Sequence, residues 1–156
     1  MDFIVRDDHA RDLVERAEWG PLAQEYYDEC ASNPVRAAPS LDMDKLHAME
    51  DCGVARVLGV YVERTDGRYL VGAAYFILGP SLYEADKIDA VCEFIFVRKA
   101  WRRGSLGLRL MREIESRAAE QGARGVTYSA PVGGPLVRLC AALGMKRTHE
   151  VFFKPV

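Results

Sequence analysis

Hydrophobic residues near the start of the chain recur every three to five positions, which is the spacing of a helix with one buried face. Between residues 7 and 31 the recurring positions are Leu13, Ala17, Leu22, Tyr26 and Tyr27. Gly20 and Pro21 interrupt the run, and neither favours a helix interior. We therefore predict two short helices rather than one.

Two prolines and few periodic apolar positions make 33–39 a predicted loop. A capped helix is expected to begin at Ser40 or Asp42 and to end near Gly53.

The pattern then changes to β-branched and aromatic runs. Residues 54–63 and 69–78 are two such runs, and Thr65-Asp66-Gly67-Arg68 lies between them. An Asp-Gly pair between two apolar runs predicts a β-hairpin. A third strand is expected over 88–97. Simple alternation would place Glu93, Ile95 and Val97 on one of its faces, and Cys92, Phe94 and Phe96 on the other.

The last part of the chain alternates helix and strand patterns. Leu106, Leu110, Ile114 and Ala118 predict a helix that Gly122 ends. A strand over 126–130, a helix from Pro135 through Leu143 that Gly144 ends, and a strand over 151–156 complete the order. This order predicts an α/β or α+β fold around one mixed sheet.

Composition supports one packed domain over residues 1–156. The chain is 49% hydrophobic and 28% charged, which is typical of a folded protein and not of a disordered one. The longest uncharged stretch, 69–83, is too short to span a bilayer as a helix, so we expect no membrane segment. Residues 1–8 lack the pattern of a secretory signal, so we expect a cytoplasmic protein.

The cysteines and histidines show no spacing typical of a metal site. They are widely separated: Cys30, Cys52, Cys92 and Cys140, and His9, His47 and His149. We expect free thiols and no metal.

Charge is unevenly distributed along the chain. Residues 1–97 carry 9 Lys and Arg against 19 Asp and Glu, whereas residues 98–156 carry 12 against 4. The basic part suggests an anionic ligand, and the acidic part a cationic second ligand. Mutual attraction of the two parts within one fold is the alternative.

A strand that feeds a glycine-containing turn and then a helix is a potential anion site, because the first N–H groups of the helix are unpaired. Residues 102–107 have this context. They match neither the Walker pattern nor the three-glycine dinucleotide pattern. The turn therefore gives no evidence for a nucleotide hydrolase or for a dehydrogenase that transfers hydride. The alternative is that Ser105 only caps the helix and that the cations are a solvated turn.

The stretch from Glu93 to Met145 resembles the core of the GNAT acetyltransferase superfamily. There, a strand ending in Val is followed five residues later by Arg/Gln-x-x-Gly-x-Gly/Ala. This chain has Val97 and then Arg102 to Gly107, with Ser105 in place of the inner glycine. Gly144-Met145 resembles the family's terminal Gly-Phe. The resemblance implies a mixed, largely antiparallel central sheet flanked by helices.

The resemblance also implies acetyl-coenzyme A (acetyl-CoA) as co-substrate. Phe96 and Val97, at the strand end, would bind the pantetheine arm through the backbone. The pyrophosphate would be held by Arg102, Arg103, Gly104, Ser105, Leu106, Gly107 and Leu108.

Catalytic candidates follow from the chemistry of acetyl transfer. Direct attack on the thioester needs a neutral amine, so a base must take a proton from the ammonium form. Glu93 is the candidate base, with a salt bridge or an exposed carboxylate as the alternative. Cys140 stands where many family members place an acidic tyrosine, and Gly133 where an asparagine often lies. A small core residue is the alternative for Cys140. Other possible acids are Tyr128, Ser129 and His149.

The resulting expectation is an N-acetyltransferase that acts on a primary amine. The acidic residues Glu25, Asp28, Glu29, Asp42 and Asp44 favour a small cationic amine or a peptide amine. One alternative is a non-catalytic acyl-CoA-binding regulator. A less favoured one is a nucleic-acid-binding module that uses Arg98, Lys99, Trp101, Arg102 and Arg103, with Trp101 stacked on a base. The acceptor's identity and the oligomeric state stay open.

Overall fold

The computed structural model describes residues 3–30, 41–81, 84–102 and 104–149. Their strands form one sheet in the order β1-β2-β3-β4-β5. The first four strands pair antiparallel, and β5 pairs parallel to β4. The mixed, largely antiparallel sheet expected from the sequence is therefore confirmed. The strands are β1 (Phe3–Asp8), β2 (Ala55–Arg64), β3 (Gly67–Pro80), β4 (Ile88–Val97) and β5 (Ala123–Tyr128).

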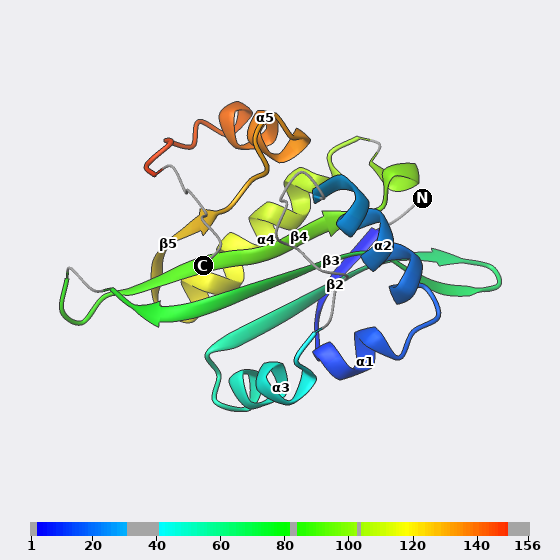
Figure 1. Cartoon of the computed structure of the whole chain (residues 1–156), viewed down its shortest axis with the longest axis horizontal. Coiled ribbons are helices and arrows are strands. Elements are labelled where there is room, and N and C mark those ends of the chain that lie inside the picture. The colour runs from blue at the N-terminus through cyan, green and yellow to red at the C-terminus, as the bar shows by residue number, and fades with distance from the viewer. Residues whose placement is uncertain (1–2, 31–40, 82–83, 103, 150–156) are drawn as a thin grey trace, which may run out of the picture.

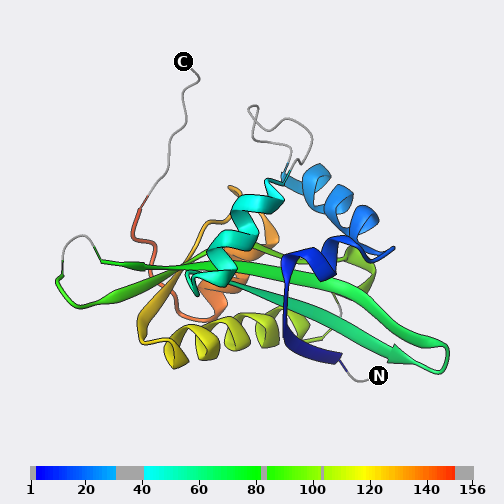
Figure 2. The same cartoon turned by 90° about the horizontal axis from the view of Figure 1, so that it is seen from below.

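Helices cover both faces of the sheet (Figures 1 and 2). In the edge-on view of Figure 2, α4 lies on one face and α2 and α3 on the other. The α-helices are α1 (Ala10–Val14), α2 (Trp19–Cys30), α3 (Met43–Asp51), α4 (Leu106–Glu120) and α5 (Pro135–Ala142), and a 3-10 turn, η1 (Lys99–Trp101), follows β4.

Each face has its own apolar core. The α4 face buries the four residues whose four-residue spacing predicted the helix: Leu106, Leu110, Ile114 and Ala118. The opposite face packs Leu13 of α1 and Leu22 of α2 against strand side chains such as Tyr61 and Phe96. The sheet is thus a rigid layer between two cores.

The first strand was not predicted. Phe3–Asp8 forms an edge strand paired with β2, although its second half is charged. Asp8 is nevertheless placed inward, because the hydroxyl of Tyr61 donates to Asp8 Oδ2 at 2.5 Å. A hydrogen bond from a distant residue satisfies this carboxylate, and the local pattern does not show it.

The two N-terminal helices are confirmed, but the expected break was misplaced. The chain leaves the helical path between Val14 and Trp19, and Gly20 and Pro21 lie inside the first turn of α2. Proline is tolerated there because the N–H groups of a first helical turn have no intrahelical partner.

Most other predicted elements are confirmed. β2 and β3 form the expected hairpin. Asp42 caps α3, since its Oδ1 accepts the Lys45 N–H at 3.1 Å. Pro135 begins α5, and Gly122 and Gly144 follow their helices with φ of +84° and +70°. The loop expected over 33–39 and the strand expected over 151–156 lie outside the described residues.

The simple alternation expected for β4 is wrong, because the strand carries a bulge. Tyr75 of β3 faces Phe94 and Phe76 faces Cys92, so Glu93 is the extra residue. The bulge shifts the alternation by one position. Cys92 consequently joins the α4-side core, whereas Phe94 and Phe96 belong to the α2-side core.

Candidate active site

A cleft opens where β4 and β5 separate. The two strands pair from Ile88 and Ala123 to Cys92 and Tyr128. Beyond this point β4 continues to Val97, while the chain after β5 turns toward α5. The cleft is lined by Tyr26, Glu29, Cys92, Glu93, Ile95, Phe96, Ser129, Pro131, Gly134, Pro135 and Leu136.

The β4 wall of the cleft presents backbone groups. Beyond the last β4 residue, the Arg98 N–H donates to Val71 of β3 at 2.9 Å. Peptide groups of successive strand residues point in opposite directions. Val97 and Ile95 therefore direct theirs to the side that β5 leaves open. The peptide groups of Phe96 face β3 instead, so the prediction that its backbone would bind a pantetheine arm is corrected to Ile95. An extended ligand with amide groups can pair with this edge as a missing strand would.

The turn after β4 leads into the N-terminus of α4. Gly104 has φ of +69°, which glycine adopts without strain. Ser105 is the exposed N-cap residue, and buried Leu106 begins the helix. The first N–H groups of α4 and its dipole make this end suited to a phosphate or pyrophosphate. Arg103 lies outside the described residues.

Arg102 connects the turn to β4 and to α2. Its Nε donates to the Val97 carbonyl at 2.7 Å, and its Nη1 pairs with Glu29 of α2 at 2.7 Å. The guanidinium carbon also lies 4.6 Å from the centre of the Phe96 ring. Three of its binding surfaces are thus occupied by the protein. The side chain that we expected to hold a pyrophosphate therefore already contacts Val97, Glu29 and Phe96.

Arg98 makes a parallel connection to α2. Its Nε donates to Glu25 Oε1 at 2.7 Å, and the Lys99 N–H donates to Oε2 at 3.1 Å. Burial opposes ionisation of Glu25, but these hydrogen bonds and the charges of Arg98 and Arg102 outweigh it and hold its pKa below the ordinary value. Helix α2 and the turn are therefore linked twice.

These contacts reduce the support for a nucleic-acid interface. Arg98 and Arg102 are neutralised by α2, and Trp101 packs edge-on against Phe3 with ring centres 6.2 Å apart. The guanidinium of Arg64 lies 5.1 Å from the Trp101 ring. The tryptophan expected to stack on a base is therefore half-buried, with Phe3 and Arg64 against its ring.

Glu93 lies at the β4 bulge with its side chain exposed. It lines the cleft and also a neighbouring hollow along β3 and β4. Burial makes the largest contribution to the raised pKa of Tyr75, and the negative charges of Glu50 and Glu93 raise it further. The sequence-predicted base is thus placed at the point where the two strands diverge.

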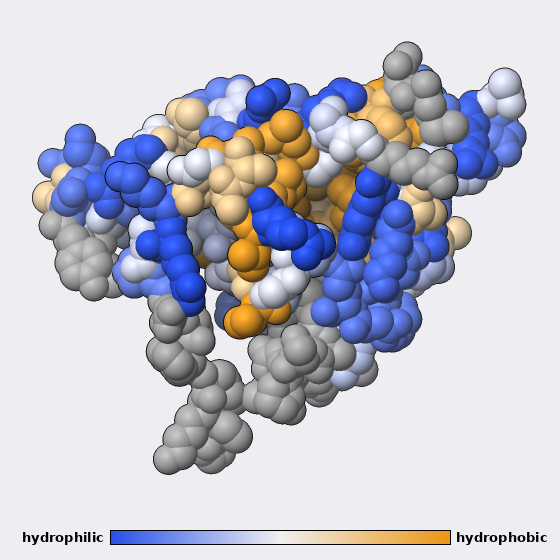
Figure 3. Space-filling model, turned by 90° about the horizontal axis from the view of Figure 1, so that it is seen from above, coloured by the Kyte–Doolittle hydropathy of each residue, from blue (hydrophilic) through white to orange (hydrophobic). Residues whose placement is uncertain are grey.

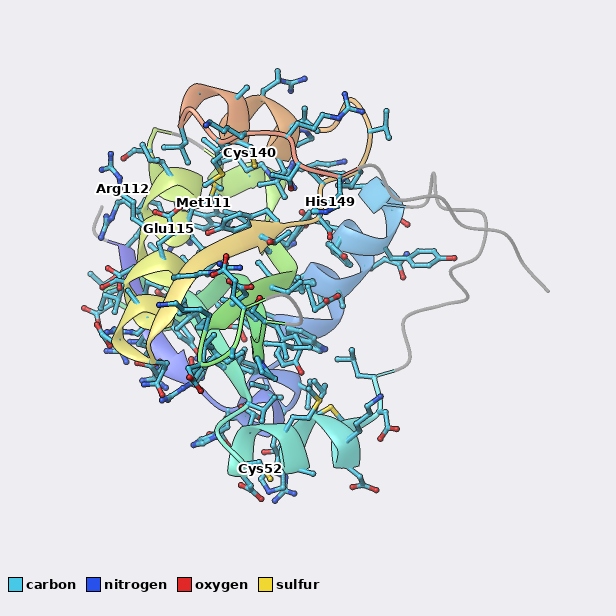
Figure 4. All side chains as sticks on the ribbon, turned by 90° about the vertical axis from the view of Figure 1, so that its left-hand side faces the viewer. Cys52, Met111, Arg112, Glu115, Cys140 and His149 are labelled. Atoms are coloured by element: carbon cyan, nitrogen blue, oxygen red, sulfur yellow. The ribbon has the colours of Figure 1, made fainter. Side chains whose placement is uncertain are left out.

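Cys140 lies on α5 and faces α4, which carries Met111 and Glu115 (Figure 4). It is not among the residues that line the cleft in the described part of the chain. Burial, and then the charge of Glu115, raise the pKa of its thiol. These surroundings favour the core interpretation over the catalytic one.

The other candidate acids are differently placed. Tyr128 donates its hydroxyl to the Met111 carbonyl at 3.3 Å, and burial raises its pKa. His149 is exposed, with Nδ1 3.0 Å from Thr148 Oγ1. Ser129 lines the cleft. Burial raises the pKa of Cys92 to about 12, so this cleft thiol stays protonated.

The surface around α5 is apolar at its centre. In Figure 3, hydrophobic side chains gather in the middle of this face and hydrophilic ones surround them. Val132 and Val137, which follow β5, are among the exposed large hydrophobic residues. An extended organic ligand can lie along such a surface with its charged end at the turn.

A sequence comparison decides the family. The model of the acetyltransferase (GNAT) family matches residues 19–145. The chain belongs to the GNAT family. It is an acetyltransferase by family, and this family generally uses acetyl-CoA.

Solved structures support the GNAT fold at low sequence identity. An aminoglycoside acetyltransferase from an uncultured soil metagenomic sample matches with a TM-score of 0.74 and 16% identity, over 100% of this chain and 99% of that one. A second metagenomic aminoglycoside acetyltransferase, in complex with sisomicin, gives 0.72 and 15%, over 99% and 96%. A ribosomal-protein-alanine N-acetyltransferase from Brucella melitensis biovar Abortus 2308 gives 0.68 and 18%, over 100% and 99%. At these identities the likeness shows the fold alone.

No protein with a curated description matches the sequence. Within the described ranges, no helix has the length and hydropathy needed to cross a membrane. The same residues contain no group of three or more His, Cys, Asp or Glu side chains arranged to hold a metal ion.

Sequence reasoning missed the contribution of α2 to the cleft. Tyr26 and Glu29 line it, although both come from a helix far from the motif. A signal was present: Glu25 and Glu29 are four residues apart, as are Arg98 and Arg102. The acidic residues thought to attract a cationic ligand are partly used here, since Glu25 and Glu29 pair with those arginines.

Proposed function

We propose that this GNAT protein transfers an acetyl group from acetyl-CoA to a primary amine by direct attack of the amine on the thioester. The observation that carries the proposal is the cleft between β4 and β5, which Glu93 lines at the bulge, together with the glycine turn that follows the end of β4. Acetyl-CoA has an amide-bearing arm and a pyrophosphate. The open edge of β4 and the start of α4 offer complementary groups.

The residues present fit this coenzyme. The backbone at Ile95 and Val97 would pair with the pantetheine arm, and the N–H groups from Gly104 to Leu108 would hold the pyrophosphate. Gly107 faces α5, and a Cβ there would lie 3.4 Å from Leu139 Cδ2, which is an ordinary van der Waals contact. When bound, the coenzyme supplies the activated acetyl group.

Glu93 would act as the base. An amine is protonated at neutral pH and cannot attack until it loses a proton, and a carboxylate at the bulge can accept it directly or through a water. Its exposed position leaves room for an acceptor on the side of the neighbouring hollow. Holding the amine and the thioester in one cleft supplies much of the remaining rate enhancement.

The acceptor class follows from charge. Exposed Glu93 lies between the cleft and the hollow. At the far side of the hollow, Glu84 and Asp89 share the single positive charge of Arg124, so the approach keeps a net negative charge. A small cationic amine or the amine of a basic peptide suits an acidic approach. Proteins that share this fold include an aminoglycoside acetyltransferase in complex with sisomicin and a ribosomal-protein-alanine N-acetyltransferase, which supports an amine acceptor of small-molecule or protein type.

Thiol release in the presence of acetyl-CoA tests the proposal. We expect release above the hydrolysis background with at least one member of a panel of mono-amines, polyamines, aminoglycosides and basic peptides. Activity toward cationic acceptors should fall with added salt more steeply than activity toward neutral ones. Equal, salt-insensitive rates would contradict the cationic class.

A non-catalytic acyl-CoA-binding regulator is the second candidate. It is favoured by Cys140, which occupies the place of the usual tyrosine and faces α4. The two candidates differ only in turnover. Coenzyme binding without thiol release from any acceptor would select the regulator.

A further inference from the structure

Helix α2 contributes a tyrosine to the lining of the cleft that also contains the β4 bulge residue Glu93. Tyr26 lines the cleft together with Glu93 and Ser129. Its ring packs on two β4 side chains that follow the bulge: the ring centres lie 4.5 Å from Phe94 and 5.6 Å from Phe96, at interplanar angles of 61° and 80°. The tyrosine is therefore seated on the strand that also carries the candidate base.

Two ion pairs fix this tyrosine relative to the turn. Glu25 precedes Tyr26 by one residue and pairs with Arg98, and Glu29 follows it by three and pairs with Arg102. Both arginines follow β4 immediately, in the segment that leads to α4. The phenol, the open edge of β4 and the phosphate-binding turn thus form one connected unit.

The other residues that carry a transferable proton are less suited. The Cys92 thiol, with its pKa raised to about 12, donates to the Phe94 carbonyl at 3.4 Å. Ser129 carries an aliphatic hydroxyl, which is a far weaker acid than a phenol with its pKa of about 10. Tyr128 is turned toward α4 and donates to Met111.

We propose that Tyr26 is the proton donor to the leaving sulfur. This inference rests on the proposed function. The amine nitrogen bonds to the acetyl carbon, the carbon–sulfur bond breaks, and the sulfur keeps the electron pair. Tyr26 gives its hydroxyl proton to that sulfur, and the phenolate regains a proton from water. Glu93 returns to water the proton that it took from the ammonium. Once the carbon–nitrogen bond has formed, Glu93 takes the second proton that the nitrogen must lose and returns it to water as well. The ammonium and the thioester thus give an amide, a thiol and one proton released to water, so protons and charge balance.

The test compares Tyr26→Phe with the adjacent Tyr27→Phe on the same helix. A positioned general acid contributes about 10²- to 10⁴-fold. We expect kcat of Tyr26→Phe to fall by roughly 100-fold or more, with an unchanged KM for acetyl-CoA and the loss of the basic limb of the kcat–pH profile. Tyr27→Phe should keep both the rate and the limb.

A binding measurement gives a second readout. The ultraviolet absorbance of the thiolate reports the pKa of the thiol of bound CoA. A hydrogen bond from Tyr26 to the sulfur stabilises the thiolate, so Tyr26→Phe should raise this pKa and Tyr27→Phe should not.

Two results would overturn the assignment. The first is a kcat for Tyr26→Phe within about threefold of that of the unchanged protein, with the basic limb of the kcat–pH profile retained. This result would show that Tyr26 does not donate the proton, although the protein is an active acetyltransferase. An unchanged protein that neither binds CoA nor releases thiol removes the proposed function and the Tyr26 assignment together.

Discussion

Arg102 and Glu29 join the turn after β4 to α2 through a contact of 2.7 Å. Both side chains are largely shielded from water, at 28% and 20% exposure. The same guanidinium donates to the Val97 carbonyl. Arginine makes these contacts with two separate nitrogens held in a rigid fork, whereas lysine has one nitrogen, which cannot occupy both positions.

Replacing Arg102 with Lys should therefore weaken acetyl-CoA binding, even though the positive charge is kept. Glu29→Gln should have a similar effect, and the double variant should lose less than the sum of the two. We expect a coupling of about 1 kcal/mol, which is typical of residues in direct contact. Binding titrations of the four proteins measure it. Full retention of affinity by Arg102→Lys would instead indicate a simple charge–phosphate contact.

Glu93→Gln removes the candidate base without changing the size of the side chain. We expect kcat/KM at neutral pH to fall by roughly 100-fold, because the amine then loses its proton only to solvent. The loss should shrink as the pH approaches the pKa of the acceptor amine. Glu63→Gln, at the far end of the β2–β3 hairpin, is the matched control. Equal rates for both variants across the pH range would exclude Glu93 as the base.

Tyr61→Phe should destabilise the fold without affecting the cleft. The hydroxyl of buried Tyr61 supplies a hydrogen bond to Asp8, whose carboxylate is only 3% exposed. Leaving that carboxylate short of a donor costs about 2 kcal/mol, or roughly 4–8 °C in Tm for a chain of this length. Thermal unfolding measures the shift, and Tyr69→Phe is the control. A Tm within about 1 °C of the unchanged protein would show that the hydrogen bond contributes little.

The link between Glu25 and Arg98 should depend on pH in one direction. Because the folded protein holds the pKa of Glu25 below its ordinary value of 4.5, the stabilisation is present above 4.5 and is lost as the pH falls through the lower folded value. Glu25→Gln should thus lower Tm at neutral pH, and the difference from the unchanged protein should vanish at acidic pH. A difference that grows on acidification would contradict this sign.

The sequence predicted most of the fold because local patterns determine most of these elements. The four-residue spacing from Leu106 to Ala118 and the Asp66-Gly67 turn needed no tertiary information. The edge strand β1 was missed because its second half is charged, and Asp8 becomes a strand residue only through Tyr61 of β2.

The site was predicted in part for the same reason. The turn after Val97 and the position of Glu93 follow from neighbouring residues, whereas the role of α2 depends on side chains more than 70 positions apart. The bulge at Glu93 reverses the faces of β4, and nothing in the strand's own alternation shows it. Arg102 was expected to meet phosphate, but its carboxylate partner came from a segment whose packing the sequence does not reveal.

Thermal unfolding with and without acetyl-CoA, on the unchanged protein and on Gly107→Glu, tests the central claim most directly. At about 100 times its dissociation constant the coenzyme should stabilise the protein by roughly 2.7 kcal/mol, or about 5–10 °C in Tm. Gly107→Glu should fold normally, because an acidic residue suits the first turn of α4. It should show no shift, since its carboxylate would repel the pyrophosphate, and Gly107→Ala should retain most of the shift. No shift for the unchanged protein at millimolar acetyl-CoA, or an equal shift for Gly107→Glu, would contradict a coenzyme site at this turn.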